Sequence, residues 1–192
     1  MIAKNCMHII LTPFFLSLLT LFLSFVFNIF IYLSLLFFLF LFLLIFFFRD
    51  PKREIGDGII SPADGKVMEA NKKISIFMNL WDVHVNRAPL DGEIKKMEHF
   101  PGKHAPAFME KENERLVTLL STEIGIIKIV QIAGIFARRI VPYVKEGDVV
   151  KKGDKIGIVR FGSKVEIYLP DNVNVIIKKG DKVKAGQTIG IL

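Results

Sequence analysis

From Ile9 to Phe48 the chain contains no charged residue, a run of 40 residues (48 − 9 + 1). As one helix this run would be about 60 Å long, roughly twice the thickness of a bilayer's hydrocarbon core. Two spans of about 20 residues fit better, so the run predicts a transmembrane helical hairpin with helices at about 9–27 and 30–48. Asn28 is expected in the turn, with burial between the two helices as the alternative.

The flanking charges predict which side of the membrane the rest of the chain occupies. Lys4 precedes the apolar run, and Arg49, Lys52 and Arg53 follow it. By the positive-inside rule, both ends of the hairpin and the polar domain face the cytoplasm, as in a multi-pass protein of the cell membrane. A secretory signal peptide is not expected, because the run is too long and no small-residue cleavage site follows it.

Composition separates the chain into an anchor, residues 1–48, and a polar domain, residues 49–192. Lys4 is the only basic residue before Arg49, so nearly all of the net charge of +7 belongs to the polar domain. This charge favours contact with anionic lipid headgroups, with plain solubility as the alternative. Nucleic-acid binding is not expected, since it would not explain the anchor. Cys6 is the only cysteine, which excludes an intrachain disulfide, and the histidines lack metal-ligand spacing.

Short β-branched segments separated by Gly, Pro, Asn and Asp fill the polar domain and predict a mainly β fold. Helix is expected only at Pro106–Glu114, with a short turn near Ala137–Arg139. The clearest predicted strands are Lys73–Phe77, Arg115–Leu120, Ile124–Ile132, Lys155–Phe161 and Lys164–Leu169.

A repeat occupies the C-terminal part of the polar domain. Val144–Val159 reads VKEGDVVKKGDKIGIV and Ile177–Leu192 reads IKKGDKVKAGQTIGIL, at an offset of 33 residues (177 − 144). Its Gly-Asp and Lys-Gly pairs suit tight turns that need a positive φ. The pattern resembles the two halves of a barrel-sandwich hybrid, the fold of biotinyl and lipoyl carriers. Lys164 is then a possible carrier lysine, although the usual small or methionine neighbours are missing.

Between the two repeats lies Gly162-Ser163, a pair that alone indicates no more than a turn. Other motifs surround it in a specific order: Phe47-Phe48-Arg49-Asp50-Pro51, Ser61-Pro62-Ala63-Asp64-Gly65, Asp82-Val83-His84-Val85-Asn86-Arg87, Pro101-Gly102-Lys103, Glu112-Asn113-Glu114-Arg115, Gln131-Ile132-Ala133-Gly134, Ala137-Arg138-Arg139-Ile140 and Arg160-Phe161-Gly162-Ser163. Together they resemble the short form of the phosphatidylserine decarboxylase family, including its archaetidylserine-acting relatives. The resemblance runs from about Phe46 to the C-terminus.

The resemblance implies self-cleavage between Gly162 and Ser163. The Ser163 hydroxyl attacks the Gly162 carbonyl, the resulting ester undergoes β-elimination, and hydrolysis of dehydroalanine leaves a pyruvoyl group and ammonia. The products would be a large chain 1–162 and a small chain 163–192. A serine hydroxyl needs a neighbouring base, and glycine leaves room for attack on its carbonyl.

The resemblance further implies that the pyruvoyl group forms a Schiff base with the serine headgroup of a membrane phospholipid. The group then serves as the electron sink for loss of CO₂, and the product headgroup is ethanolamine. Phosphatidylserine and archaetidylserine remain alternatives as substrate, with a slight preference for the archaeal lipid from the sequence His104–Phe108. A homodimer is suggested by the family.

His84 is the expected acid/base residue, since histidine titrates near neutral pH. Strand alternation predicts that Asp82, His84 and Asn86 share one face. The resemblance suggests that Asp64 orients or charges the histidine that activates Ser163.

The chain departs from longer family members, which carry two histidines three residues apart. Arg87 occupies the second position, so either His84 serves both cleavage and decarboxylation or another residue serves one. His99 and His104 are weaker candidates. Arg87, Arg138 and Arg139 are expected to bind the lipid phosphate, because guanidinium groups suit phosphate oxygens.

Two other function classes remain open from the residues alone. A carrier domain would be one intact chain modified at Lys164, and a membrane-tethered structural domain would be intact and unmodified. The intact mass of the purified protein distinguishes all three hypotheses.

Overall fold

The computed structural model describes residues 1–102, 113–134, 139–160 and 163–192. The chain divides into two compact units, Met1–Pro51 and Lys52–Leu192. The first unit contains helices α1 (Met7–Leu23) and α2 (Ile29–Phe47). The strands of the second are β1 (Ile59–Ile60), β2 (Gly65–Ala70), β3 (Lys73–Met78), β4 (Val85–Arg87), β5 (Gly92–Phe100), β6 (Arg115–Thr122), β7 (Gly125–Ala133), β8 (Ile140–Pro142), β9 (Val149–Val150), β10 (Lys155–Val159), β11 (Ser163–Tyr168), β12 (Asn174–Val175), β13 (Lys182–Val183) and β14 (Thr188–Ile191).

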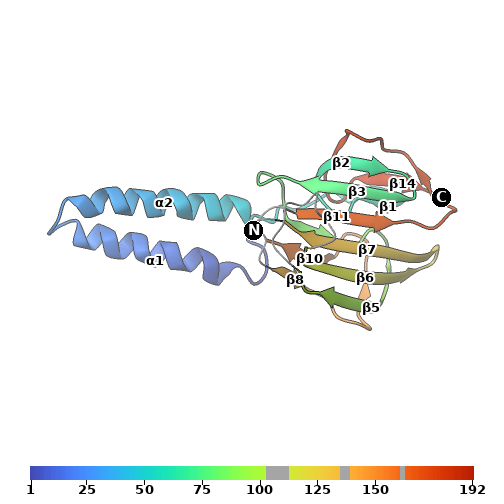
Figure 1. Cartoon of the computed structure of the whole chain (residues 1–192), viewed down its shortest axis with the longest axis horizontal. Coiled ribbons are helices and arrows are strands. Elements are labelled where there is room, and N and C mark those ends of the chain that lie inside the picture. The colour runs from blue at the N-terminus through green and yellow to red at the C-terminus, as the bar shows by residue number, and fades with distance from the viewer. Residues whose placement is uncertain (103–112, 135–138, 161–162) are drawn as a thin grey trace. The chain divides into compact units, whose positions relative to one another are not determined.

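Helices α1 and α2 run antiparallel to one another (Figure 1). Small polar residues face the contact between them: Ser17, Thr20 and Ser34 are buried, and the Ser34 hydroxyl donates to the Ser17 carbonyl at 3.1 Å. Most of the leucine and phenylalanine side chains point outward. Helix α2, with 19 residues, is long and apolar enough to cross a membrane, whereas α1 is apolar but shorter, with 17 residues.

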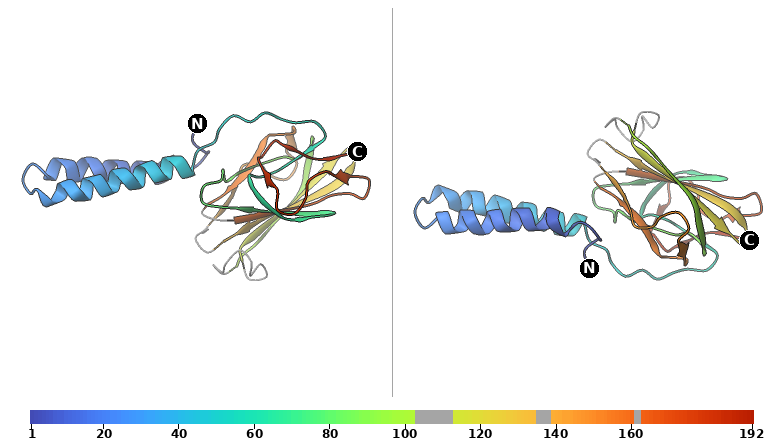
Figure 2. Two further views of the ribbon diagram at one scale, coloured as in Figure 1. Left: turned by 90° about the horizontal axis from the view of Figure 1, so that it is seen from above. Right: turned by 90° about the horizontal axis from the view of Figure 1, so that it is seen from below.

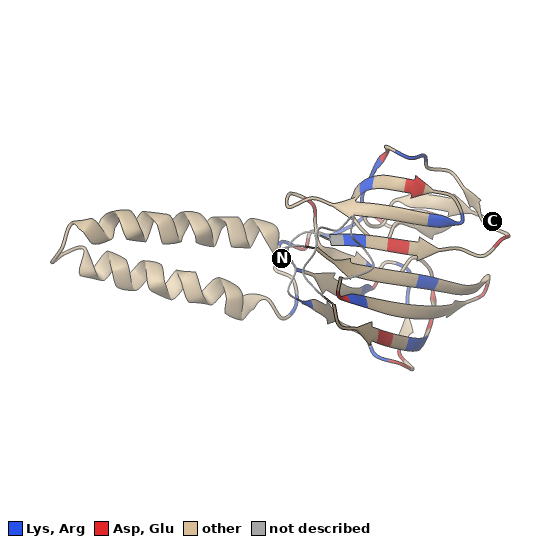
Figure 3. Ribbon diagram, viewed as in Figure 1, with Lys and Arg blue, Asp and Glu red and all other residues tan. Residues whose placement is uncertain are grey.

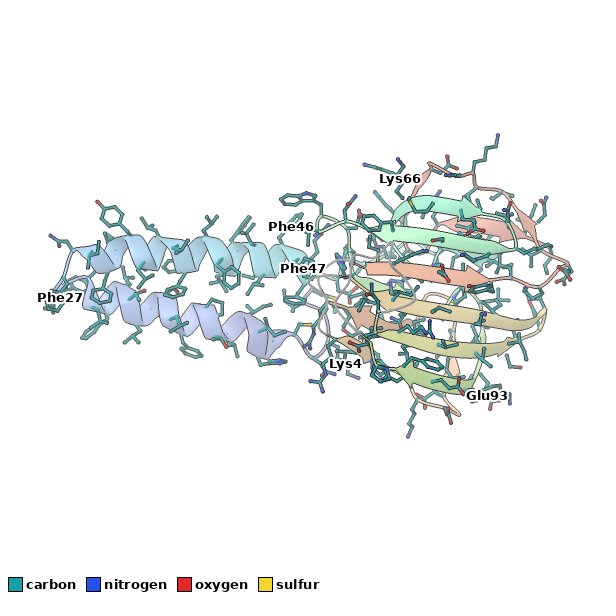
Figure 4. All side chains as sticks on the ribbon, in the orientation of Figure 1. Lys4, Phe27, Phe46, Phe47, Lys66 and Glu93 are labelled. Atoms are coloured by element: carbon teal, nitrogen blue, oxygen red, sulfur yellow. The ribbon has the colours of Figure 1, made fainter. Side chains whose placement is uncertain are left out.

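Asn28 lies exposed at the connection between the helices, so the alternative that buries it between them is wrong. At the other end of the hairpin, the chain before α1 pairs with the chain after α2. Ile2 forms a β-bridge with Arg49, and the Ala3 N–H donates to the Phe48 carbonyl at 2.8 Å. These bonds hold the two open ends of the hairpin together. In Figure 4, Lys4 and Phe47 lie at this end and Phe27 lies at the turn.

The second unit is mainly β. Its long sheet has eight strands in the order β13-β2-β3-β11-β7-β6-β5-β9, and two short sheets have the orders β1-β14-β12 and β4-β10-β8. Figures 1 and 2 show the short sheets on one side of the long one. Alternate residues of the long strands face the core between these layers. In β6, for example, Leu116, Thr118 and Leu120 are buried and their neighbours are less so.

The five clearest predicted strands are present, each within two residues of its expected ends, as β3, β6, β7, β10 and β11. The helix expected at Pro106–Glu114 falls almost entirely outside the described residues, as does most of the turn expected near Ala137–Arg139.

The repeat forms matching turns. In both copies an aspartate caps its own turn: Asp148 Oδ2 accepts the Lys145 N–H at 2.9 Å, and Asp181 Oδ2 accepts the Lys178 N–H at 2.8 Å. Gly147 (φ +84°) and Gly180 (φ +100°) occupy equivalent left-handed positions. The turn prediction from the Gly-Asp pairs is therefore confirmed in both copies.

The internal similarity extends beyond this repeat. The long sheet reads the same from both edges if β13, β2, β3 and β11 are matched with β9, β5, β6 and β7. The pairs Ile59–Gly190 and Asn86–Gly157 are equivalent, at offsets of 27 (86 − 59) and 33 (190 − 157) residues. Even the bulge in β2 after Val67 recurs in β5 after Ile94. The domain therefore has an approximate twofold axis between β7 and β11, where the two buried side chains Ile129 and Ile167 are paired.

Candidate active site

Ser163 is the first residue of β11, the strand that lies between β3 and β7. It is paired with Met78, the last residue of β3, and with Ala133, the last residue of β7. Gly162 and the Ser163 side chain lie outside what the structure describes. Because β11 is hydrogen-bonded on both sides, a break just before Ser163 would leave the following strand held within the sheet.

His84 lies directly before β4 and is fully buried. Its Nδ1 is 2.9 Å from the Asp82 carbonyl oxygen. A carbonyl can only accept, so Nδ1 carries the hydrogen in this contact and Nε2 is the ring atom that can take up a proton. The His84 carbonyl accepts the Val159 N–H at 3.2 Å, which places His84 beside the last residue of β10, four residues before Ser163 (163 − 159).

The predicted alternation around His84 is wrong in part. The strand begins only at Val85, and Asp82 belongs to a turn in which its carboxylate accepts the Asn79 N–H at 2.8 Å. β4 is buried on both faces, because it lies between the sheets rather than on a half-exposed surface. His84 is consequently oriented by the turn that precedes the strand.

A pair of buried amides connects β4 to the strands that flank Ser163. The Asn86 side chain lies 3.6 Å from the sulfur of Met78 and accepts a hydrogen bond of 2.7 Å from Gln131. Both amides are almost completely buried. Sequence reasoning assigned neither a role, although a buried polar residue within a short apolar strand was the available signal. These contacts fix the segment carrying His84 against β3 and β7.

Asp64 lies at the same end of the long sheet as Ser163. Lys66 of β2 is paired with Phe77, which is paired with Lys164, so β3 alone separates the start of β2 from the start of β11. At about 4.8 Å per strand, the two backbones are roughly 10 Å apart. Gly65 has a positive φ of +147°, and a Cβ there would lie 2.2 Å from the Phe77 carbonyl oxygen, so only glycine fits beside Asp64.

The Asp64 carboxylate is buried and has two partners among the described residues. Oδ1 accepts the Ala185 N–H at 2.8 Å, and Oδ2 forms an ion pair with Arg53 at 2.5 Å. In this part of the chain no contact joins Asp64 to His84, so its proposed influence on the histidine stays a prediction.

On the other side of Ser163 the same sheet end carries Asn113 and Glu114. Asn113 donates to the Ala133 carbonyl at 2.9 Å, and the Ala133 N–H donates to the Glu114 carbonyl at 2.9 Å. The Glu114 carboxylate lies 2.8 Å from Nε2 of His99. His99 is therefore engaged by a carboxylate two strands from β11, and His104 lies outside the described residues.

Comparison with known proteins gives this arrangement a family. The model of the family described as phosphatidylserine decarboxylase matches residues 40–191. The chain belongs to the phosphatidylserine decarboxylase family. Relatives include a phosphatidylserine decarboxylase proenzyme of Streptomyces griseus, 49% identical over 150 residues that cover 73% of this chain and 70% of the relative. A protein of Archaeoglobus fulgidus assigned as an archaetidylserine decarboxylase proenzyme is 44% identical over 146 residues, 75% of each chain.

The position of Arg87, where longer members of the phosphatidylserine decarboxylase family were expected to have a second histidine, is the last residue of β4. Its side chain is buried and donates to the Gly153 carbonyl at 2.9 Å. Arg139 is exposed, and its carbonyl accepts the Arg160 N–H at 3.3 Å. Arg138 lies outside the described residues. The structure therefore brings Arg139 and Arg160 together next to the cleavage segment, and sequence reasoning had not singled out Arg160.

The carrier hypothesis for Lys164 is wrong. A carrier lysine must be exposed at the tip of a hairpin, whereas Lys164 is buried in the central region of the long sheet, 2.9 Å from Glu166. Glu166 also lies 3.2 Å from the Lys73 ammonium and accepts the Tyr168 hydroxyl at 2.8 Å. Burial raises the pKa of Glu166, but the hydrogen bonds from Lys164 and Tyr168 outweigh it and hold the pKa below the ordinary value. Glu166 and its partners thus form an ionised cluster that anchors β11 beside Ser163.

Proposed function

We propose that the chain decarboxylates the serine headgroup of a membrane phospholipid, after cutting itself between Gly162 and Ser163. Membership of the phosphatidylserine decarboxylase family carries this proposal, together with the place of Ser163 at the start of a strand that is paired on both sides. The expected products are a large chain 1–162 and a small chain 163–192.

The residues present fit a pyruvoyl group at position 163. The group would start the small chain, and β11 would keep it in place through its pairing with β3 and β7. Its carbonyl supplies the electron sink that loss of CO₂ requires. The ion pair of Lys164 with Glu166 fixes the residue next to it at a buried position.

We assign proton transfer to Nε2 of His84. The Asp82 carbonyl engages Nδ1 and orients the ring, and the contact of Asn86 with Met78 holds the segment against the strand that ends beside Ser163. A positioned histidine typically accelerates proton transfer by about 10²–10⁴-fold. Asp64 supports cleavage in this proposal from the same sheet end.

Among the arginines, Arg139 is the first choice for the lipid phosphate because its side chain is exposed close to the cleavage segment. Arg87 is a weaker candidate, since the Gly153 carbonyl holds its guanidinium group in the interior. Arg138 keeps its predicted role from the sequence.

The remaining parts of the proposal concern the surroundings of the domain. The hairpin of α1 and α2 anchors the enzyme in the cell membrane as two spans, with the β unit on the cytoplasmic side. The C-terminal repeat belongs to a barrel-sandwich hybrid, and two copies form a homodimer. The serine headgroup is common to phosphatidylserine and archaetidylserine, and both are proposed as substrates.

Purification of the full chain in detergent, followed by intact-mass measurement and assay on both lipids, tests this function. Two polypeptides are expected, the smaller with 30 residues (192 − 163 + 1) and a blocked, carbonyl-bearing N-terminus, together with release of CO₂. The Ser163→Ala variant is expected to stay intact and inactive. A wild-type protein that remains one polypeptide, or a Ser163→Ala variant that still splits, rules the proposal out.

A further inference from the structure

The approximate twofold axis allows an internal comparison of charge. Five lysines lie on exposed positions at the β13–β2 edge of the long sheet, and we name this group the basic corner: Lys66, Lys178, Lys179, Lys182 and Lys184. The equivalent residues at the β9–β5 edge, named the neutral corner, are Glu93, Lys145, Glu146, Val149 and Lys151. The same five positions therefore carry a charge of +5 at one edge and 0 at the other.

The equivalence of the two corners follows from the strand pairing. Lys182–Lys66 and Val183–Gly65 are paired at one edge, and Val149–Glu93 and Val150–Gly92 are paired in the same way at the other. Figure 4 labels the equivalent residues Lys66 and Glu93 at opposite edges of the sheet, and Figure 3 shows the different charges there. Since the backbone is the same at both corners, the fold does not require the lysines.

The protein does not neutralise the basic corner internally. Among the described residues, none of its five ammonium groups forms an ion pair, and Asp181, the acid within the turn, is engaged with the Lys178 N–H. At the neutral corner, by contrast, Glu93 pairs with Lys95 at 2.7 Å and Glu146 accepts the Met97 N–H at 2.7 Å. The basic corner thus keeps a concentrated positive charge available to an external anion.

The basic corner also lies at the reactive end of the sheet. Lys182, Lys66, Phe77 and Lys164 form one row across β13, β2, β3 and β11. At about 4.8 Å per strand, the row places the basic corner roughly 10–15 Å from the residue that follows Ser163. A surface that binds the corner would therefore lie close to the site where the lipid headgroup reacts.

We propose that the basic corner docks the β unit on an anionic lipid surface, so that the Ser163 end of the sheet faces the headgroups. The choice of lipid over another polyanion rests on the proposed function, because the substrate is itself a lipid in such a surface. Clusters of several lysines bind anionic leaflets without a specific pocket, and salt weakens this attraction.

The full chain is reconstituted in nanodiscs of phosphatidylcholine, or of phosphatidylcholine mixed with phosphatidylglycerol, and hydrogen–deuterium exchange is followed by mass spectrometry. In the anionic discs we expect exchange in residues 176–184 to slow by about fivefold or more, and exchange in residues 143–151 to stay unchanged. High salt should abolish the difference. Equal exchange of residues 176–184 in both kinds of disc would overturn the proposal, as would equal slowing at both corners.

The neutral corner supplies a matched pair of variants. Lys66→Glu with Lys179→Glu gives the basic corner the residues that its equivalent already carries, so folding should survive. Lys145→Glu with Lys151→Glu makes the same charge change at the neutral corner. The first variant should lose the lipid-dependent slowing and the second should keep it, and the reverse result contradicts the proposal.

A short DNA duplex added to the phosphatidylcholine discs examines the other class of polyanion. Slowing by DNA without slowing by phosphatidylglycerol would overturn the lipid assignment. Exchange does not depend on turnover, so CO₂ release from the same preparations shows whether a failure concerns the basic corner or the decarboxylase function.

Discussion

Asp64 and Asp91 are equivalent residues of the two halves of the β unit, and both accept a backbone N–H from the repeat. Asp64 Oδ1 accepts from Ala185 at 2.8 Å, and Asp91 Oδ1 accepts from Lys152 at 2.5 Å. Only Asp64 is buried and has an ion pair, with Arg53. The backbone contact is thus a shared structural role, and what distinguishes Asp64 is its charge at the Ser163 end of the sheet.

This distinction predicts different results for two asparagine variants. Asparagine can still accept the backbone N–H, so Asp91→Asn should fold and cleave normally. Asp64→Asn loses the charge and should slow self-cleavage by about 100-fold, the scale of proton-transfer assistance. The rate is measured as the disappearance of the uncut chain on denaturing gels. Arg53→Gln is the control, because an equal slowing there would mean that the ion pair alone matters.

His84 is predicted to be required for decarboxylation. In His84→Gln, release of CO₂ should fall by about 10²–10⁴-fold, because glutamine cannot exchange a proton. The extent of cleavage, measured separately by mass, shows whether the same residue also serves maturation. His99→Gln is the control and should keep both activities, since His99 is engaged by Glu114. An inactive His99→Gln beside an active His84→Gln would reverse the assignment.

Glu166 is predicted to stabilise the β unit in a pH-dependent way. Its pKa is lowered in the folded protein, so its contribution is complete above the unfolded pKa, about 4.3, and is lost as pH falls through the lower folded value. Glu166→Gln should lower the free energy of unfolding by about 2 kcal/mol at pH 7, since it weakens charged hydrogen bonds of Lys164 and Lys73.

Denaturant titrations at pH 7 and at pH 3 would measure this effect. The difference between wild type and Glu166→Gln should shrink at the lower pH. Glu98→Gln, which removes a more exposed partner of Lys96, should change stability by less than about 0.5 kcal/mol. An undiminished difference at pH 3 would show that charge is not the cause.

The proposed topology predicts which residues are reached from outside the cell. Asn28→Cys lies at the turn of the hairpin and should react with a membrane-impermeant maleimide in intact cells. Lys179→Cys, in the β unit, should react only after the cells are opened. The native Cys6 is buried and provides the background. Labelling of Lys179→Cys in intact cells would place the β unit on the opposite side.

Local features of the chain could be read from the sequence, because they depend on residues close together. The 40-residue uncharged run (48 − 9 + 1) implied two helices, and the structure has them at Met7–Leu23 and Ile29–Phe47. The Gly-Asp pairs implied turns, and Gly147 and Gly180 adopt the required positive φ. The ordered motifs around Ser163 likewise implied the family that the comparison shows.

Contacts between distant strands could not be read in this way. Gln131 reaches Asn86 across 45 residues, and Lys164 is buried only because β3 and β7 enclose β11. The twofold relation was also hidden, since the halves are interleaved: β4–β10 are inserted between β3 and β11, and the equivalent segments differ in most of their residues. The sequence by itself determined the helices, the turns and the residue expected to react. Strand pairing, which depends on the register between segments far apart in the chain, decided which side chains lie beside it.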